Sequence, residues 1–317
     1  KRRISEGVQC CARLQQRDLG MRGIKIGFVA GLLCFSYGNP LAWAQADRDG
    51  GLDLASAIAK QSDASELFYR VDWGALALAE LRVSVSKDQD RRVLVTKGET
   101  LGVLSLFSDW SFFQAMAAEG DRRAVFSTRS FKGGDPYADF KVVWAQGRLP
   151  QVSGELGVQE DEDLTPIPEG ELRDTRSPYQ SIFQLAEKLA RDQSCALTQR
   201  IFDGVRRYDV IVRDEGRETL DADRDWTYGG PAIKCRLIFK QIGGFSREPS
   251  SWSTEEEQME RFLWLARLRD DLWIPVRLKV SSALGYATGR LVTDRQALAA
   301  ADTAKSDNWF RFGQRDK

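Results

Sequence analysis

Residues 68–86 read FYRVDWGALALAELRVSVS, and this stretch decides the fold class. Apolar and polar residues alternate on both sides of Gly74. A period of two places alternate side chains on opposite faces of a strand, so one face can be buried and the other solvated. The stretch therefore predicts a half-buried β-hairpin.

Similar strand patterns recur outward from this hairpin as far as residue 292. The further strand candidates are 92–96, 125–131, 137–145, 197–202, 208–213, 235–239, 262–268, 272–280 and 286–292. Residues 101–118 are bulky enough to be buried, but their pattern does not distinguish helix from strand. Strands joined by short turns predict a mainly antiparallel, β-rich α+β fold, either a curved sheet or an open barrel.

One helix is expected at residues 178–192. Ser177 and Gln180 have the spacing of a capping box, and Pro178 suits the first helical position. The apolar residues then recur at helical spacing, at Tyr179, Ile182, Phe183, Ala186 and Leu189. A helix with one apolar stripe is expected to cover a face of the sheet.

Residues 21–44 have the three parts of a secretory signal peptide. Met21, Arg22 and Lys25 form a basic start, residues 26–37 form an apolar core, and the segment ends Ala-Trp-Ala. The core has about a dozen residues, whereas a membrane-spanning helix needs roughly 20. We therefore expect a periplasmic protein that begins at Gln45 and has no transmembrane span after cleavage.

The expected signal peptide and its cleavage site divide the chain into several segments. Residues 1–20 are expected to be an upstream extension or a start-site artefact, and residues 45–65 a mobile lead-in. Removing residues 1–44 of the 317 leaves 273, enough for one β-rich domain at 66–293 and a C-terminal tail at 294–317. Residues 146–175 are rich in Pro, Gly and acidic side chains and are the best candidate for a boundary between two halves.

Composition excludes several classes of function. The 46 basic and 46 acidic side chains balance, so neither nucleic acid nor an anionic membrane surface is favoured as a partner. The chain contains no histidine, which excludes Ser-His-Asp and Cys-His hydrolases and histidine-ligated metal sites. We expect no cofactor and no metal, and only carboxylate, lysine or tyrosine chemistry remains open to an enzyme.

Two cysteines, Cys195 and Cys235, remain after residues 1–44 are removed. Two thiols in an oxidising compartment usually pair, and a loop of this length is expected to stabilise the fold by roughly 4 kcal/mol. A zinc site is the alternative, but it would need two further soft ligands. The sequence therefore favours a disulfide.

Two charged clusters invite a functional interpretation. Asp203, Arg206, Arg207 and Asp209 surround an Asp-Gly turn, where they could form cross-strand ion pairs or contact an anion or a partner protein. The acidic residues of 221–225 have the spacing of the first calcium-loop ligands, but Trp226 replaces the required glycine. A solvated turn is the better interpretation of the second cluster.

The chain resembles the family called domain of unknown function (DUF) 3108 over roughly residues 65–293. The residues that carry the resemblance are Tyr69–Gly74, Ser194-Cys195, Phe202–Tyr208, Lys234-Cys235, Gly243-Gly244-Phe245, Trp273–Arg277 and Leu284-Gly285. The resemblance implies an exported, strand-rich protein of a Gram-negative envelope. It implies no activity, and no catalytic residue is carried over.

Three functions are compatible with these observations. The first is a non-catalytic periplasmic protein whose curved sheet binds an apolar, lipid-like ligand or an envelope partner. The second is a structural or assembly factor that acts through protein contacts alone. The third is a hydrolase, which would need two carboxylates about 5–10 Å apart in a cleft.

The signal peptide yields a direct prediction. N-terminal sequencing of stable protein recovered from the periplasm should begin at Gln45, because the Ala-Trp-Ala ending supplies the small residues that signal peptidase requires. Recovery of folded protein beginning at Met21 or Lys1 would contradict it.

Overall fold

The computed structural model describes residues 65–312 apart from 89–90, 103–104, 106–108, 121, 158–162, 248–258, 270–271 and 283–284. The predicted signal peptide and nearly all of the lead-in lie outside the described residues.

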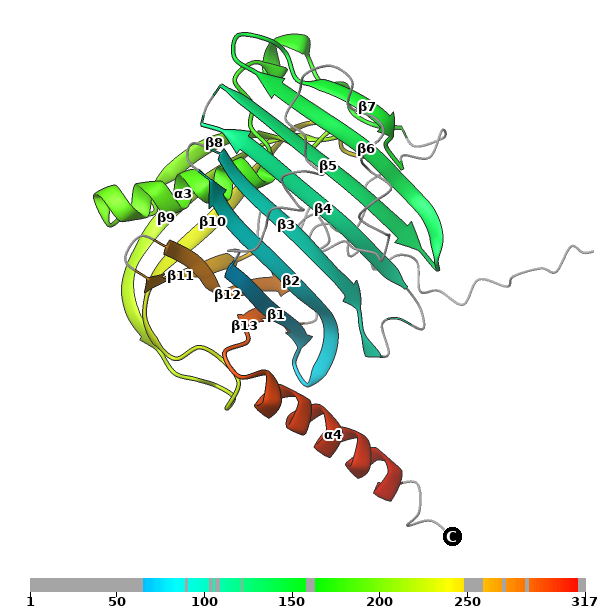
Figure 1. Cartoon of the computed structure of the whole chain (residues 1–317), viewed down its shortest axis with the longest axis vertical. Helices are drawn as coiled ribbons and strands as arrows, with labels where there is room; N and C mark the ends of the chain where they lie inside the picture. Colours follow the sequence, from blue (N-terminus) through cyan, green and yellow to red (C-terminus); the bar gives the residue numbers. More distant parts are fainter. Residues whose placement is uncertain are drawn as a thin grey trace, which may run out of the picture. The chain divides into compact units, whose positions relative to one another are not determined.

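Thirteen strands in this part of the chain form one sheet (Figure 1). They are β1 (Ser65–Trp73), β2 (Leu76–Asp88), β3 (Arg91–Thr100), β4 (Trp110–Glu119), β5 (Arg123–Lys132), β6 (Asp135–Ala145), β7 (Gln151–Glu155), β8 (Leu197–Phe202), β9 (Arg207–Leu220), β10 (Gly230–Gly243), β11 (Arg261–Arg269), β12 (Leu272–Ser282) and β13 (Gly285–Leu291). The helices are η3 (Glu169–Leu172), α3 (Pro178–Asp192) and α4 (Arg295–Phe312). The expected fold class, mainly antiparallel β, is confirmed.

The first and last strands join the two halves of this sheet. The strand order is β7-β6-β5-β4-β3-β2-β1-β13-β12-β11-β10-β9-β8, and Tyr69 of β1 lies opposite Leu291 of β13. Every other neighbouring pair is consecutive along the chain and antiparallel. The edges β7 and β8 are therefore connected by residues 156–196, the segment that contains α3. We call β1–β7 the first half of the sheet and β8–β13 the second half.

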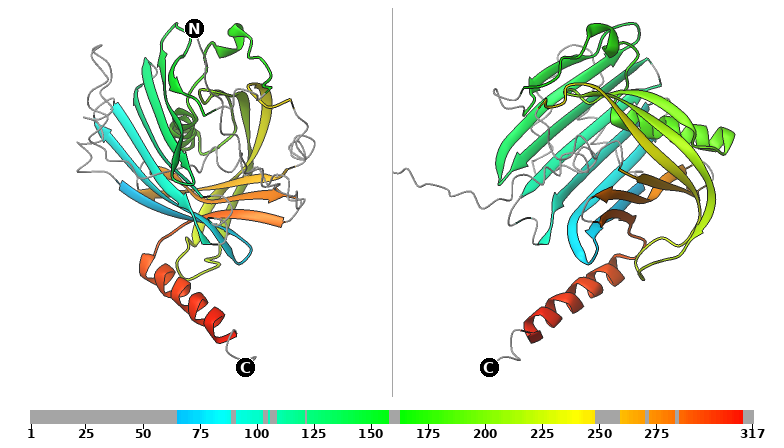
Figure 2. Two further views of the ribbon diagram at one scale, coloured as in Figure 1. Left: turned by 90° about the vertical axis from the view of Figure 1, so that its right-hand side faces the viewer. Right: turned by 180° about the vertical axis from the view of Figure 1, so that it is seen from behind.

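Helix α3 begins and ends as the sequence predicts. The Ser177 hydroxyl accepts a hydrogen bond from the Gln180 N–H at 3.1 Å, and the Gln180 side chain accepts one from the Ser177 N–H at 3.0 Å. The capping box is thus confirmed. Figure 2 (left) looks along the helix, which lies between the cyan-to-green strands of the first half and the yellow strands of the second.

Strands β3–β5 are apolar on both faces rather than alternating. Val93, Leu94 and Val95 are consecutive and all buried. Leu94 belongs to the cluster that packs with α3, whereas its two neighbours belong to a second cluster with Phe113, Ala115, Ala117 and Val125. Consecutive buried residues indicate that both faces of these strands are covered.

The structure adds detail to three segments. Most of residues 101–118, whose type the sequence left open, lies in or just before strand β4, and the expected C-terminal tail contains helix α4. The expected linker at 146–175 contains β7, which pairs with β6 and has all five residues exposed. An exposed edge strand needs no apolar alternation, so its sequence resembles a loop. The linker joins the two edges of a single sheet.

The position of α3 predicts the effect of a buried charge. Leu185 is buried between α3 and the second half of the sheet. Replacing it with Asp should lower the free energy of unfolding by roughly 3–5 kcal/mol, because the carboxylate would have no partner there. Chemical denaturation measures this difference. Ala190→Asp, which places the same charge at an exposed position of the helix, is the control and should cost far less. Equal midpoints for both variants would contradict the packing.

Candidate functional site

The surface beneath α3 is apolar in both halves of the sheet. The N-terminal part of the helix packs on a cluster that comprises Leu94, Met116, Ala118, Ala124, Phe126, Ala138, Phe140, Val142, Trp144 and Phe202. The C-terminal part of the helix packs on Val212, Ile233, Leu237, Leu265, Trp273 and the two cysteines. One helix thus covers apolar surface from strands that lie far apart in the sequence. We call this surface the inner face.

Polar contacts hold the helix to the first half of the sheet. The Tyr179 hydroxyl donates a hydrogen bond to Oε1 of Gln114 on β4 at 2.5 Å, and the Gln114 amide donates to Thr128 on β5 at 3.3 Å. Arg92 of β3 forms an ion pair with Glu187 of the helix. The same guanidinium lies 5.6 Å from the centre of the Phe183 ring. Few polar contacts therefore supplement a mainly apolar interface.

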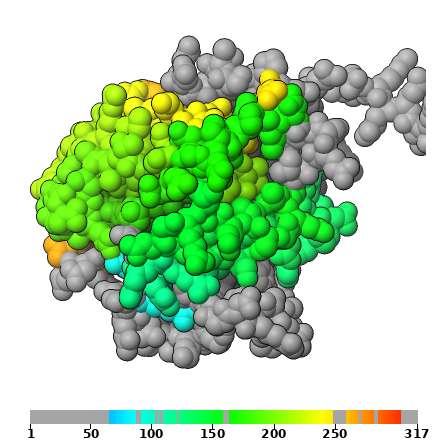
Figure 3. Space-filling view, turned by 90° about the horizontal axis from the view of Figure 1, so that it is seen from above, coloured from blue at the N-terminus to red at the C-terminus, as the bar shows by residue number. Residues whose placement is uncertain are grey.

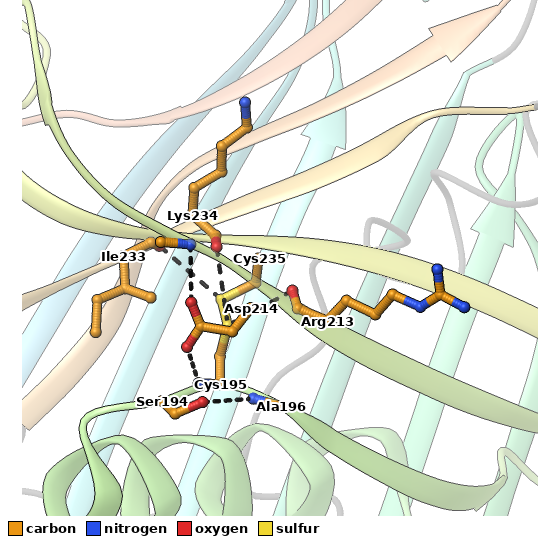
Figure 4. Close-up of a disulfide and its surroundings, with 9 residues drawn as sticks. Ser194, Cys195, Ala196, Arg213, Asp214, Ile233, Lys234 and Cys235 are labelled. Atoms are coloured by element: carbon orange, nitrogen blue, oxygen red, sulfur yellow. Dashed lines mark hydrogen bonds between the residues drawn. A yellow bond between two sulfur atoms is a disulfide. The ribbon is translucent and has the colours of Figure 1, made fainter.

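The C-terminal end of the helix is tied to the second half by a disulfide. Cys195 and Cys235 are bonded, with their Cα atoms 6.3 Å apart, as the sequence favoured (Figure 4). Cys235 lies on β10 directly opposite Asp214 of β9. Because Cys195 follows the helix by three residues, the bridge limits how far this end of α3 can move from the sheet.

Asp214 adds a charged contact beside the disulfide. Its carboxylate accepts hydrogen bonds from the Cys195 N–H at 3.1 Å and the Gly216 N–H at 2.8 Å. Partial burial acts to raise the pKa of this carboxyl, but hydrogen bonds from Ser194, Gly216 and Cys195 hold it below the ordinary value. The residue therefore serves as an anionic anchor for the turn after the helix.

The Asp203-Gly204 turn is held by Asp203 itself. One carboxylate oxygen accepts from the N–H groups of Val205 and Arg206 at 3.0 and 2.7 Å, and the other accepts from the Arg206 guanidinium at 3.1 Å. Asp203 and Arg206, two of the four charged side chains predicted at this turn, therefore have a partner within it.

Arg207 is buried, with only 1% of its side chain exposed. It pairs with Asp209 at 2.6 Å and donates a hydrogen bond to the Glu171 carbonyl at 2.8 Å. Glu171 lies on η3 and also pairs with Arg200 of β8 at 3.0 Å. The cluster fastens the segment before α3 to the second half of the sheet. Contact with an external anion or partner stays a prediction, centred on the partly exposed Arg206.

The same turn also meets the first half of the sheet. A Cβ atom on Gly204 would contact the Phe140 ring of β6, and one on Gly244 would contact the backbone around Val205. Thr165, between β7 and α3, receives a hydrogen bond from Gly244 and donates one to Phe245. Figure 3 shows this end of the sheet, where green residues lie directly against yellow-green and yellow ones. The two edges thus approach each other here.

A second buried charge network lies on β1 and β13. Asp72 is 2% exposed and lies 3.3 Å from Arg290, which also binds Asp223 at 2.8 Å. Arg70, almost equally buried, pairs with Glu80 of β2 and with Asp302 of α4 at 3.1 Å. Alternation assigns these side chains to a solvated face, so the sequence alone does not indicate this network. A buried Arg-x-Asp pair cannot be distinguished from a solvated one without knowing which strand lies alongside.

Asp223 keeps its charge in this network. Partial burial acts to raise its pKa, but hydrogen bonding and attraction from Arg290, aided by Arg277, hold it below the ordinary value. Asp72 and Asp223 are thus two carboxylates bridged by one guanidinium. A hydrolase pair needs one carboxyl that stays protonated, and the environment of Asp223 disfavours that form.

The described part of the chain contains no group of three or more Cys, Asp or Glu side chains arranged to hold a metal ion. Asp223, taken from the calcium-like spacing, pairs instead with arginines. None of the described helices is long and apolar enough to cross a membrane.

Comparison with known proteins agrees with the resemblance seen in the sequence. The family model described as "Protein of unknown function (DUF3108)" matches residues 69–292, well over half of the chain. The chain belongs to this family. The DUF3108 match begins within β1, ends just after β13, and includes α3, both cysteines and the Asp203-Gly204 turn.

The other comparisons give less information about this DUF3108 protein. No curated protein matches its sequence. Among solved structures, it is similar to a β-barrel-like protein of the domain of unknown function DUF1849 from Brucella abortus. The two share 11% identity with a TM-score of 0.45, over 72% of this chain and 95% of the other.

Because the two edges of the sheet approach each other, we expect alanine substitutions at two glycines to destabilise the protein to different degrees. Gly204 and Gly216 both have positive φ, at 104° and 96°, but only Gly204 faces a neighbouring side chain. Gly204→Ala should therefore destabilise the protein by roughly 1–3 kcal/mol more than Gly216→Ala, because the added methyl group must displace the Phe140 ring. Thermal and chemical denaturation of both variants measure the difference. Equal losses of stability in the two variants would show that backbone strain alone causes the destabilisation, and that the turn does not pack on β6.

Proposed function

We propose that this protein is a non-catalytic envelope protein of the periplasm whose inner face holds an apolar, lipid-like ligand or an envelope protein partner. The observation that carries the proposal is the inner face itself, which is apolar in both halves of the sheet and meets a single helix. Export is supported by residues 21–44, whose pattern is that of a signal peptide.

The helix is the natural competitor of such a ligand. Tyr179, Ile182 and Phe183 fill the inner face of the first half, where an acyl chain would find the same apolar surroundings. A ligand can replace the helix only if its own binding free energy is more favourable than that of helix docking. The disulfide after α3 would keep the displaced helix close to its site.

Chemistry of the described residues supports a binding role over catalysis. The chain lacks histidine, the usual base near neutral pH. The carboxylates of Asp72 and Asp223 are both engaged by Arg290. A hydrolase is therefore the less favoured alternative.

A structural or assembly factor is the second candidate. The observation that favours it is that α3 already covers the inner face, so the fold needs no ligand to bury its apolar surface. Native mass spectrometry of protein purified from the periplasm separates the two candidates. A co-purifying lipid supports ligand binding, and a stoichiometric protein supports assembly.

Loosening the helix should strengthen binding of an apolar probe. Glu187→Gln removes the ion pair between α3 and Arg92 and should raise the affinity for cis-parinaric acid by about 1.5- to 5-fold, the range set by a partly exposed pair. Fluorescence titration of the mature protein measures this affinity.

Lys188→Gln is the matched control, because the ion pair that Lys188 forms among the described residues is with Asp192 of the same helix. Its affinity should equal that of the unmodified protein. If neither the unmodified protein nor Glu187→Gln binds the probe, ligand binding at the inner face is excluded and the assembly role is favoured.

A further inference from the structure

A row of polar side chains crosses the inner face of the first half of the sheet. Thr96 of β3 lies directly opposite Gln114 of β4, which lies directly opposite Thr128 of β5. Directly opposite residues of antiparallel strands share a face, and Gln114 contacts Tyr179 of α3, so all three side chains lie on the face that meets the helix. We call these three side chains the polar row.

Thr96 is the member of the polar row whose hydrogen bonding is incomplete. It is 2% exposed, and its hydroxyl forms no hydrogen bond with the described residues. Gln114, by contrast, accepts a hydrogen bond from the Tyr179 hydroxyl and donates one to Thr128. A buried hydroxyl without a partner costs free energy, and such groups are rare in folded proteins. The Thr96 hydroxyl therefore points to a ligand that completes its hydrogen bonding.

Tyr179 indicates which chemistry fits this part of the inner face. Its ring packs edge-on against Phe126, with the ring centres 5.7 Å apart, and its hydroxyl reaches Gln114. The side chain thus combines an apolar body with a neutral polar end. Its one hydroxyl satisfies Gln114 and leaves Thr96 unpaired. A ligand with an apolar body and two neutral polar groups at one end would satisfy both residues.

The neighbours of the polar row on the same face of β3–β5 are uncharged. Two residues away along these strands lie Leu94, Met116 and Phe126 on one side and Gly98, Phe112 and Ser130 on the other. Arg92 lies four residues from Thr96 along β3, which is about 13 Å, and it is paired with Glu187 of the helix. An ionised head group at the polar row would therefore be buried without an opposite charge, which is costly.

We propose that the polar row binds the neutral, hydroxyl-bearing head group of a single-chain lipid such as a monoacylglycerol. Hydroxyl and ester groups of the head donate to and accept from Thr96 and Gln114. The acyl chain takes the place of Tyr179, Ile182 and Phe183 on the apolar cluster of the first half. This inference rests on the function proposed for the inner face and adds the class of ligand and the position of its head group.

Competition against cis-parinaric acid on the mature protein tests the head-group assignment. The competitors are monomyristoylglycerol and myristate at mildly alkaline pH, which share one acyl chain and differ in the charge of the head group. Both are used below the concentrations at which they form micelles. We expect monomyristoylglycerol to displace the probe at a lower concentration than myristate does.

Thr96→Val keeps the approximate shape of the side chain and removes its hydroxyl. It should weaken monomyristoylglycerol binding by about 2- to 12-fold, the range for one hydrogen bond between neutral groups, and leave myristate binding unchanged. The same variant should not lower the denaturation midpoint, because the hydroxyl has no partner among the described residues of the unliganded protein. A purely structural role for Thr96 would instead lower the midpoint and affect both competitors alike.

Ser127→Ala is the matched control. Ser127 is equally buried, and its hydroxyl also lacks a partner among the described residues. It lies between Phe126 and Thr128 on β5 and so faces the opposite side of the sheet. Its removal should leave displacement by both competitors unchanged. Equal weakening of monomyristoylglycerol binding in Thr96→Val and Ser127→Ala would refute the head-group site.

Failure of the head-group assignment and failure of the proposed function give different results. If cis-parinaric acid does not bind to the unmodified protein, ligand binding at the inner face and the head-group site are both overturned. If the probe binds and myristate displaces it as well as monomyristoylglycerol does, or better, only the head-group site is overturned.

Discussion

Burial of the inner face by α3 is the interaction on which the rest of the structure depends. The sheet curves so that apolar side chains of both halves face the same helix, and each half meets a different part of it. The helix must therefore begin and end at defined residues, which the capping box and the disulfide ensure. The segment before the helix is held in the same way, through Glu171 and the buried Arg207.

Buried arginines link segments that the sheet alone would leave apart. Arg207 connects η3 to β9, and Arg290 connects β13 to β1 and to the turn that contains Asp223. A buried ion pair contributes little net stability, because desolvation of both charges opposes their attraction. Removal of one partner is costly, however, since it leaves a buried charge without compensation. Such pairs therefore disfavour alternative arrangements of the strands they connect.

The inner face and the charge network on β1 and β13 differ in chemistry because they lie in different parts of the fold. The inner face is apolar where α3 packs on it, so the ligand proposed for it would have to compete with a helix of the same chain. The network on β1 and β13 is polar, and its arginines and carboxylates already satisfy each other. Apolar packing therefore holds the first region together, and ion pairing holds the second.

The sequence by itself determined the elements that depend on neighbours along the chain. Alternation predicted the β1–β2 hairpin, the Ser177 and Gln180 spacing predicted the start of α3, and two cysteines in a chain expected to be exported predicted the bridge. The tertiary structure alone decided the pairing of β1 with β13, the burial of Arg207 and Asp72, and strand β7 within an apparent linker. Local patterns report which side chains share a face, whereas burial and ion pairing depend on residues that are distant in sequence and become neighbours only when the sheet curves around α3.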